Sequence, residues 1–518
     1  MQLKRTLFFS LLFASLYNYS FWKKVIEAYG FSASSIAFLS SMALSLFLLF
    51  FILFQLTNFK FLAKPFLCLF TFFAALSAAF MDSYGYVINI NSFTNIMETD
   101  IREARDLINT SLILYFIFAA LLPMIFILRT KFSYPKKKQL FKFFFIAFTL
   151  FFTNFAIFNK SYVGFFKNYK PLRQYVNPIQ PIYAFSFYLK KKYFTQKYEF
   201  ITLGEKTLTY PKGNKNKLII LAVGETARAA NFSLNGYSKK TNAYLEKEKR
   251  LISFKQVFSC GTETSISLPC LFSYYGRKNF DLEKAKHTEN LLDVLNKAQI
   301  RVSWRDNDSG NKGLAARVKQ EDFNDALIEP FCNKEFGCHD EVLLNKLQNY
   351  VDEKKTDTLI VLHFKGNHGP AYFRRYPKEF IKFTPQCESE FLSNCTREQI
   401  INSYDNAILY TDYVLSKTIQ FLKDQTKNYD VALLYISDHG ESLGELGVYL
   451  HAMPYSIAPE FQRHVPMIFW SNNSFPISYD KLLQKQNENL THDNIFHSVL
   501  GLFKINIPQY NKDLDFFN

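Results

Sequence analysis

The chain has 518 residues, enough for two or three domains, and its 58 Phe and 31 Tyr exceed what one soluble core needs. The formal net charge of +16 could suit a polyanionic partner, but the basic residues are spread over linkers and loops without a nucleic-acid-binding motif. We therefore expect no nucleic acid partner. A basic protein at a membrane of anionic lipids is the simpler interpretation.

Five apolar stretches predict helices that cross a membrane, at residues 6–22, 34–57, 65–81, 110–128 and 140–158. Each is close to the roughly 17–25 residues that a helix needs to span a bilayer. A cleaved signal peptide is the alternative for the first 20 residues, but no small-x-small cleavage site follows them. We therefore expect a five-helix transmembrane bundle over residues 1–159.

The charges of the loops predict the orientation of these helices. Basic residues precede the first span and lie in the loops after the second and fourth spans, whereas the loop 82–109 is mainly acidic. The positive-inside rule then places the N-terminus in the cytoplasm and everything after the fifth span outside it. Lys23 and Lys24 on the first outer loop depart from this rule.

Six of the seven cysteines lie beyond the predicted spans, as the neighbouring pairs Cys260/Cys270, Cys332/Cys338 and Cys387/Cys395. Six cysteines allow fifteen connectivities, so the pairing of neighbours is a hypothesis. An even number of closely spaced cysteines suits an oxidising compartment such as the periplasm. Zinc-finger ligation is the weaker alternative, because no pair has C-x-x-C spacing.

The remaining residues predict a linker and an outer domain. Residues 160–211 mix Phe and Tyr with Lys, which predicts amphipathic helices along the membrane–water interface. From residue 212 to residue 518 short β-branched runs alternate with polar helical stretches, which is typical of an α/β domain. We expect strands at residues 218–223, 300–304, 358–363, 431–437 and 467–470, and helices at residues 288–298, 340–353 and 396–423.

Polar residues follow three of these strands. Glu225 follows the first, Asp438 and His439 follow the fourth, and His368 lies shortly after the third. Ligands of open α/β sheets gather beyond the carboxyl ends of the strands, and carboxylate oxygen with imidazole nitrogen suits zinc. A lone Asp-His-Gly is more often a capped turn, but the recurrence at one sheet edge favours a metal site.

Thr264 lies between Cys260 and Cys270, just before a stretch that can begin a helix at residue 265. The N-terminus of a helix favours anions. A metal held by Glu225, Asp438 and His439 would lower the pKa of the Thr264 hydroxyl and leave it a coordination position. Without those ligands the simpler interpretation would be a helix cap. With them we expect a nucleophile.

Five motifs in this order resemble those of the lipid A phosphoethanolamine transferases, the family of transferable colistin resistance within the alkaline phosphatase/sulfatase superfamily. They are G-E-T-A-R-A-A-N-F-S-L-N-G-Y (224–237), C-G-T-E-T-S-I-S-L-P-C (260–270), G-N-H-G-P (366–370), S-D-H-G-E-S-L-G-E (437–445) and H-D-N-I-F-H (492–497). The resemblance covers nearly the whole chain. It implies a sulfatase-like catalytic domain with a central mixed sheet, outside the bacterial inner membrane.

The resemblance also implies the roles of individual residues. Thr264, and not Thr262, matches the nucleophile, and it joins Glu225, Asp438 and His439 around one tightly bound zinc. By the same resemblance, His368 and His451 hold the substrate phosphate or a second, looser zinc, and either could protonate the leaving group. Lys312 matches a residue that contacts phosphate. Asn95 and Glu103 match residues that receive the lipid headgroup.

The chain departs from the family pattern at two places. Asn311 and Ala315 stand where several relatives have cysteines, so we expect a looser loop around Lys312. Glu263 replaces a small or neutral residue before the nucleophile. Its carboxylate would either receive the ammonium of the headgroup or face solvent.

The family implies transfer of phosphoethanolamine from phosphatidylethanolamine to lipid A phosphate, through a phosphoethanolamine–threonine intermediate, and resistance to cationic peptides. Core heptose and envelope proteins are alternative acceptors. A phosphoglycerol transferase, phosphatase or sulfatase on the same fold is an alternative enzyme, and a degenerate envelope-binding module is the non-enzymatic alternative. We expect a monomer.

Overall fold

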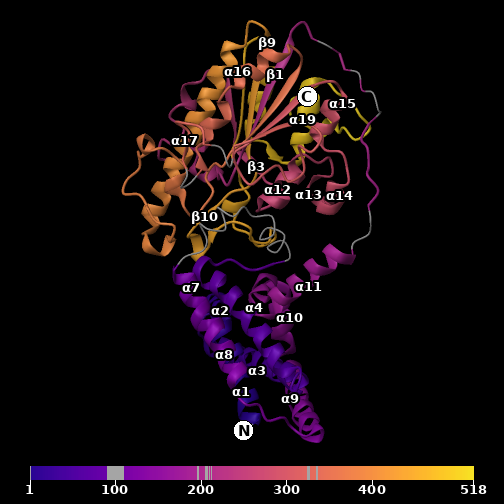
Figure 1. Cartoon of the computed structure of the whole chain (residues 1–518), viewed down its shortest axis with the longest axis vertical. Helices are drawn as coiled ribbons and strands as arrows, with labels where there is room; N and C mark the ends of the chain where they lie inside the picture. The colour runs from indigo at the N-terminus through magenta and orange to yellow at the C-terminus, as the bar shows by residue number, and fades with distance from the viewer. Residues whose placement is uncertain are drawn as a thin grey trace. The chain divides into compact units, whose positions relative to one another are not determined.

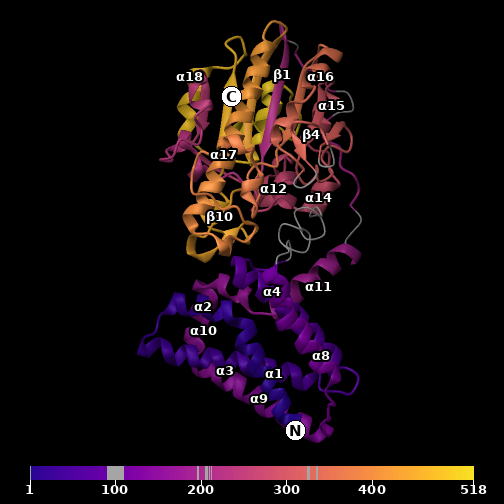
Figure 2. The ribbon, with the colours of Figure 1, turned by 60° about the vertical axis from the view of Figure 1, so that its left-hand side comes forward.

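The computed structural model describes residues 2–89, 110–194, 198–204, 208, 210–211, 213–323, 327–333 and 337–518. The described residues form two compact units, one within residues 2–194 and one within residues 198–518 (Figures 1 and 2). The division at residues 159 and 211 stays a prediction. Asn95 and Glu103 lie outside the described residues.

The first unit is helical. Four of its helical stretches are long and apolar enough to cross a membrane, namely Ser35–Leu56, Ala63–Tyr84, Thr110–Arg129 and Lys137–Ile157. Its helices are α1 (Gln2–Ala14), α2 (Tyr19–Tyr29), α3 (Ala33–Leu56), α4 (Ala63–Tyr84), α7 (Thr110–Phe116), α8 (Leu122–Arg129), α9 (Lys137–Ile157), α10 (Asn159–Asn168) and α11 (Ile179–Phe194), with a π-helical turn at Ile117–Leu121 between α7 and α8.

The expected count of five spans is not confirmed among the described residues, because the first predicted span is interrupted. Helix α1 has 13 residues, or about 20 Å of length, whereas the hydrocarbon core is about 30 Å thick. A short 3-10 turn at Leu16–Asn18 separates α1 from α2. The apolar composition of residues 6–22 does not reveal this break.

Two buried asparagines, far apart in the sequence, stabilise the break. Asn18 donates hydrogen bonds to the carbonyl oxygens of Phe13 and Asn177, at 2.7 and 2.6 Å. Asn177 in turn donates to the carbonyl oxygens of Tyr17 and Ala74, at 2.8 and 2.7 Å. These side chains satisfy carbonyl groups at the interruption, where the helical ladder leaves them without a backbone partner.

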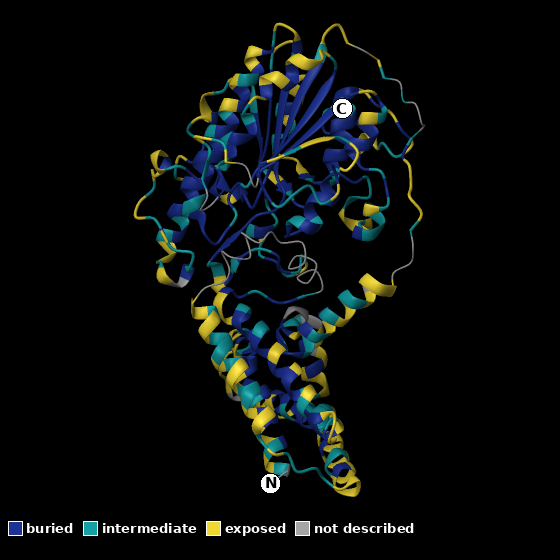
Figure 3. Cartoon of the chain, viewed as in Figure 1, coloured by how far each residue is buried: buried dark blue, intermediate teal, exposed yellow. Residues whose placement is uncertain are grey.

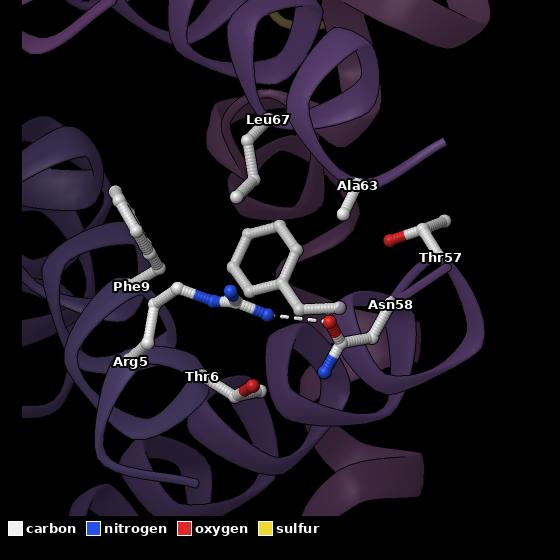
Figure 4. Close-up of a pocket in the computed structure, with 8 residues that line it drawn as sticks. Arg5, Thr6, Phe9, Thr57, Asn58, Ala63 and Leu67 are labelled. Atoms are coloured by element: carbon white, nitrogen blue, oxygen red, sulfur yellow. Dashed lines mark hydrogen bonds between the residues drawn. The ribbon is translucent and has the colours of Figure 1, made fainter. Parts of the chain in front are cut away.

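Aromatic side chains fill the core of the first unit, and one polar pocket lies beside it. The ring of Phe13 packs against Phe50, Phe54 and Phe70. Figure 4 shows the pocket, in which the Arg5 guanidinium donates to Asn58 Oδ1 at 2.5 Å. It is lined by Arg5, Thr6, Phe9, Phe54, Thr57, Asn58, Ala63 and Leu67. With neither acid nor imidazole in its lining, this pocket is not an active-site candidate.

The second unit is built on a seven-stranded sheet of order β2-β12-β9-β1-β8-β4-β5. Only β12 runs antiparallel to its neighbours, so the sheet is mixed, as predicted. The five predicted strands are confirmed. The seven strands are β1 (Asn216–Gly224), β2 (Leu251–Phe254), β4 (Arg301–Asp306), β5 (Lys319–Asp322), β8 (Thr358–His363), β9 (Tyr429–Ser437) and β12 (Met467–Ser471).

The central strands are buried along almost their whole length (Figure 3). Strands covered on both faces consist of continuous apolar runs, and this is why β1, β8 and β9 could be found in the sequence. The edge strand β5 reads Lys-Gln-Glu-Asp and has no such pattern. The short strands of the unit are β3 (Gln256–Phe258), β6 (Cys332–Asn333), β7 (Gly337–Cys338), β10 (Ser442–Leu443), β11 (Tyr449–Leu450) and β13 (Asn489–Thr491).

Helices cover both faces of the sheet, with α16 and α17 on one side and α15 and α19 on the other (Figure 1). The helix expected at residues 340–353 is wrong in one respect: a 3-10 turn, Asp340–Leu344, comes first, and Lys346 at φ 54° separates it from α16. The helices are α12 (Thr264–Leu271), α13 (Gly276–Asn279), α14 (Leu282–Lys286), α15 (Leu291–Lys297), α16 (Leu347–Glu353), α17 (Arg397–Asp424), α18 (Tyr479–Gln484) and α19 (Asp493–Phe503).

Three disulfides join sequence neighbours in the second unit: Cys260–Cys270, Cys332–Cys338 and Cys387–Cys395. The first of them spans the start of α12 and reaches into the helix. It therefore ties the loop that precedes Thr264 to the helix that Thr264 begins. Cys68 in α4 is a buried free thiol.

Replacing Cys260 and Cys270 together by serine should lower the unfolding temperature of the second unit by about 5 °C. A cross-link across 10 residues contributes about 3 kcal/mol through the entropy of the unfolded chain. Circular dichroism of the full-length protein in detergent measures the change. The pair Cys387→Ser, Cys395→Ser, with a separation of 8, is the matched control and should show a similar fall. An unchanged unfolding temperature of the first variant would contradict this expectation.

Candidate active site

The parallel pairing of β1 with β9 brings the first two acidic residues together. Gly224, the last residue of β1, is in register with Ser437, the last residue of β9, so Glu225 and Asp438 follow at the same sheet edge. The backbone N–H of Asp438 donates to the Gly224 oxygen at 2.9 Å, and that of Thr226 to Asp438 Oδ1 at 3.2 Å. Both carboxylates are fully buried.

Thr264 meets these carboxylates from the start of α12. Its hydroxyl Oγ1 donates to Glu225 Oε2 at 3.0 Å and lies 3.4 Å from His439 Nε2. The same imidazole nitrogen lies 3.3 Å from Glu225 Oε1 and 3.3 Å from Asp438 Oδ2. The structure therefore brings together all four residues expected around the metal. Thr264 is the one member of the set that is partly exposed.

The electrostatics of this set suit a divalent cation. Burial lowers the pKa of His439 well below its ordinary value, and nearby His451 adds to this effect, so the ring is neutral. Its Nδ1 lies 3.0 Å from the Gly440 oxygen, which can only accept, so Nδ1 carries the proton. Nε2 then presents a lone pair to two carboxylate oxygens.

Acceptors that face one another without a donor are costly in a buried site. Asp438 Oδ2 accepts no hydrogen bond from any residue that the structure describes, and burial raises the pKa of Asp438 to about 6. A divalent cation among these atoms would satisfy all of them. Carboxylate oxygen and imidazole nitrogen are ligands that zinc takes, so the residues fit the expected ion.

Two further imidazoles lie next to His439. The ring centroid of His451 is 4.5 Å from that of His439 and 5.3 Å from that of His368. Ligand atoms of Glu225, His439 and His451 all lie within 4.8 Å of one another. Both histidines expected from the sequence are thus near the metal set, and their roles stay predictions.

Glu441 orients His451, and the sequence analysis missed it. This buried carboxylate accepts from Tyr372 Oη at 2.9 Å through Oε1, and Oε2 lies 2.9 Å from His451 Nδ1. With Nδ1 donating to Glu441, His451 keeps Nε2 for a ligand or a proton. Glu441 belongs to the S-D-H-G-E motif, but its role depends on partners from two other segments.

Glycine at position 440 is required by the close approach of another segment. A Cβ at this position would lie 2.0 Å from the backbone oxygen of Phe461, so any larger residue would displace the turn that carries Asp438 and His439. This is the close approach of backbone that glycine permits. Glycine thus keeps the turn in place.

The remaining candidates are placed as follows. Thr262 is buried and donates to the Met453 oxygen at 2.6 Å, which supports Thr264 as the reactive threonine. Glu263 is 3% exposed and therefore does not face solvent. Lys312 Nζ donates to the Ser309 oxygen at 2.8 Å. At Asn311, where the resemblance implies a cysteine in several relatives, the side-chain oxygen Oδ1 accepts from the backbone N–H groups of Gly313 and Ala315 at 3.0 and 3.3 Å.

Comparison with protein families matches both units. Residues 217–505 match the family model described as "Sulfatase", and residues 46–193 match "Phosphoethanolamine transferase EptA/EptB". The two models together cover most of the chain. The second unit therefore has the sulfatase fold. The match of the first unit is more specific, because that family model describes phosphoethanolamine transferases.

Individual relatives match over nearly the whole chain. "Phosphatidylethanolamine transferase Mcr-2" of Escherichia coli is 38% identical over 96% of this chain and 94% of its own length. "Phosphoethanolamine transferase EptA" of Salmonella typhimurium is 36% identical, covering 98% and 95%. The solved lipooligosaccharide phosphoethanolamine transferase A of Neisseria meningitidis has a TM-score of 0.93 and 33% identity, covering 99% and 97%.

Glu441→Gln should lower kcat about tenfold and leave KM almost unchanged, because an amide replaces the charged group that orients His451. The measurement is turnover of the phosphatidylethanolamine donor that the sequence motifs imply, with the full-length protein in detergent. Glu445→Gln is the matched control, since Glu445 pairs with Arg228 at 2.8 Å and does not contact His451. Equal loss in both variants, or a large change in KM, would refute the orienting role.

Proposed function

The chain belongs to the phosphoethanolamine transferase family, and from this premise we propose that it moves phosphoethanolamine from phosphatidylethanolamine to a lipid A phosphate. The observation that carries the proposal is the contact of the Thr264 hydroxyl with Glu225 and His439 at the start of α12. The name of the Mcr-2 relative supports the donor. The lipooligosaccharide transferase of Neisseria meningitidis supports the acceptor.

Glu225, Thr264, Asp438 and His439 are the residues that would hold one zinc. When bound, zinc lowers the pKa of a hydroxyl in its coordination sphere and neutralises charge on phosphate oxygens. The protein supplies the remaining requirements. Glu225 Oε2 accepts the hydrogen bond of Thr264, which aims the oxygen and gives its proton a destination.

In the first step the Thr264 oxygen forms a bond to phosphorus, and the bond from phosphorus to the diacylglycerol oxygen breaks. The hydroxyl proton leaves Thr264 toward Glu225, and the diacylglycerol oxygen takes up a proton from His451 or His368, so diacylglycerol departs neutral. Phosphoethanolamine remains esterified to Thr264. Backbone N–H groups at the start of α12 favour the negative charge of its phosphate.

In the second step an oxygen of the lipid A phosphate attacks the same phosphorus. The bond to Thr264 breaks, and the threonine oxygen takes back the proton held by Glu225. The attacking phosphate hydroxyl gives its proton to the histidine that protonated diacylglycerol. Two displacements at one phosphorus leave the enzyme unchanged, and the second joins the phosphate of phosphoethanolamine to the lipid A phosphate through a phosphoanhydride bond. The acceptor gains one phosphoethanolamine unit, whose ammonium masks part of the anionic charge.

The helical unit suits this chemistry, because donor and acceptor are both membrane lipids. We place the N-terminus in the cytoplasm, five spans in the bacterial inner membrane and the catalytic unit in the periplasm as a monomer. Four apolar helices of spanning length and three disulfides in the second unit support this arrangement.

Thr264→Ala should abolish release of diacylglycerol from phosphatidylethanolamine, by at least about 1,000-fold, because it removes the hydroxyl that donates to Glu225 Oε2 and is the proposed nucleophile. Thr264→Ser should retain part of the activity, and mass spectrometry of that protein should find phosphoethanolamine on residue 264. Thr262→Ala is the matched control and should still form the intermediate. Release from phosphatidylglycerol instead of phosphatidylethanolamine would favour a phosphoglycerol transferase.

Cells that produce the active protein should carry lipid A heavier by phosphoethanolamine, and cells with Thr264→Ala should not. Mass spectrometry of lipid A, core oligosaccharide and envelope proteins reads out the acceptor directly. Sensitivity to a cationic peptide should fall in parallel, because anionic charge is masked. Addition on core heptose or protein, with unchanged lipid A and unchanged sensitivity, would overturn the assignment of the acceptor.

A further inference from the structure

A second cluster of acid and imidazole groups lies at the ends of the two strands next to β1. Asp306 ends β4 and His363 ends β8, and the two residues are in register in the parallel pair. Asp308 follows two residues after β4. All three are at most 3% exposed. The strand order β9-β1-β8-β4 thus delivers titratable groups from four adjacent strands, with Glu225 between the two clusters.

Asp306 fixes the orientation of the His363 ring. His363 Nδ1 lies 3.1 Å from Asp306 Oδ2. The same carboxylate accepts from Trp304 Nε1 at 2.6 Å and from the backbone N–H groups of Asp308 and Gly310 at 2.9 and 3.3 Å. A carboxylate that already accepts from three N–H groups is held as an anion, and an anionic carboxylate can only accept. His363 Nδ1 is therefore the donor in the contact.

The other nitrogen of His363 points at the neighbouring carboxylates. Nε2 is buried, makes no hydrogen bond to any described residue, and lies 3.8 Å from Asp308 Oδ2. One ligand atom each from Glu225, Asp308 and His363 lie within 4.8 Å of one another. Nδ1 of His363 donates to the Asp306 carboxylate, and Nε2 faces the other carboxylate oxygens. Histidines that bind metals commonly have this arrangement.

Charge balance at this sheet edge points the same way. Four buried carboxylates converge here, those of Glu225, Asp306, Asp308 and Asp438, and one zinc offsets two of their charges. Buried charges that stay uncompensated are costly.

We propose that Glu225, Asp308 and His363 bind a second divalent cation of the zinc class, which shares Glu225 with the zinc of the nucleophile. The sharing of Glu225 rests on the proposed function, which assigns this residue to the zinc next to Thr264. Imidazole nitrogen with two carboxylates is a donor set that suits zinc. The site differs from the looser one expected at His368 and His451.

The test counts bound zinc. The full-length protein in detergent is stripped with a chelator, reloaded with Zn²⁺ alone and desalted, and zinc per chain is measured by elemental mass spectrometry. Asp308→Asn and His363→Gln should each bind one zinc fewer than the unmodified chain. His368→Asn is the matched control. Because His368 is not one of the three proposed ligands, this variant should keep the zinc held by Glu225, Asp308 and His363.

A second variant guards against loss of fold. Asp306→Asn keeps all three proposed ligands and removes the carboxylate that orients His363. In a zinc titration, the affinity of the site that contains His363 should fall about 10- to 100-fold, and the affinity of the site next to Thr264 should stay unchanged. Circular dichroism of each variant establishes that the sheet is retained.

Several outcomes would overturn the proposal. They are a count of one in the unmodified chain, an unchanged count in folded Asp308→Asn, or a loss that appears only in His368→Asn or His451→Asn. Failure of the proposed function is distinguishable, because it would appear as missing diacylglycerol release while the zinc count still fell with Asp308→Asn. A phosphoethanolamine–Thr264 intermediate in a chain that binds a single zinc would instead refute this inference alone.

Discussion

The parallel pairing of β1 with β9 and β8 is the constraint on which the rest of the catalytic unit depends. Because the strands are parallel and in register, Glu225, Asp438 and His363 leave the sheet at one edge. Bringing so many acids together costs free energy unless a cation compensates them. The buried apolar strands behind this edge supply stability that offsets part of that cost.

Much of the catalytic unit could be predicted because its information is local. Continuous apolar runs mark the buried strands, and the residue after each run is the candidate ligand, which is how Glu225 and Asp438 could be found. The breaks in the helices could not be predicted in this way. The interruption between α1 and α2 depends on Asn18 meeting Asn177, which is 159 positions away, and an apolar window contains no trace of that contact.

The same distinction separates the site residues that were predicted from those that were missed. Thr264 and His439 stand in recognisable motifs, and their neighbours in sequence suggest what they do. Glu441 stands in such a motif too, but its function lies in the contacts with Tyr372 and His451. Asp306 and His363 belong to no motif that suggested chemistry. Only the register of β4 with β8 brings them together.

The burial of the ligands decides how a substrate can enter. Glu225, Asp438 and His439 are fully buried, whereas Thr264 is partly exposed, so Thr264 is the member of the set that the phosphorus of the proposed donor could reach. The Cys260–Cys270 disulfide spans that residue and joins its loop to α12. In the proposed reaction the Thr264 oxygen, held by Glu225 and by the disulfide-linked start of α12, would lose little freedom on attack.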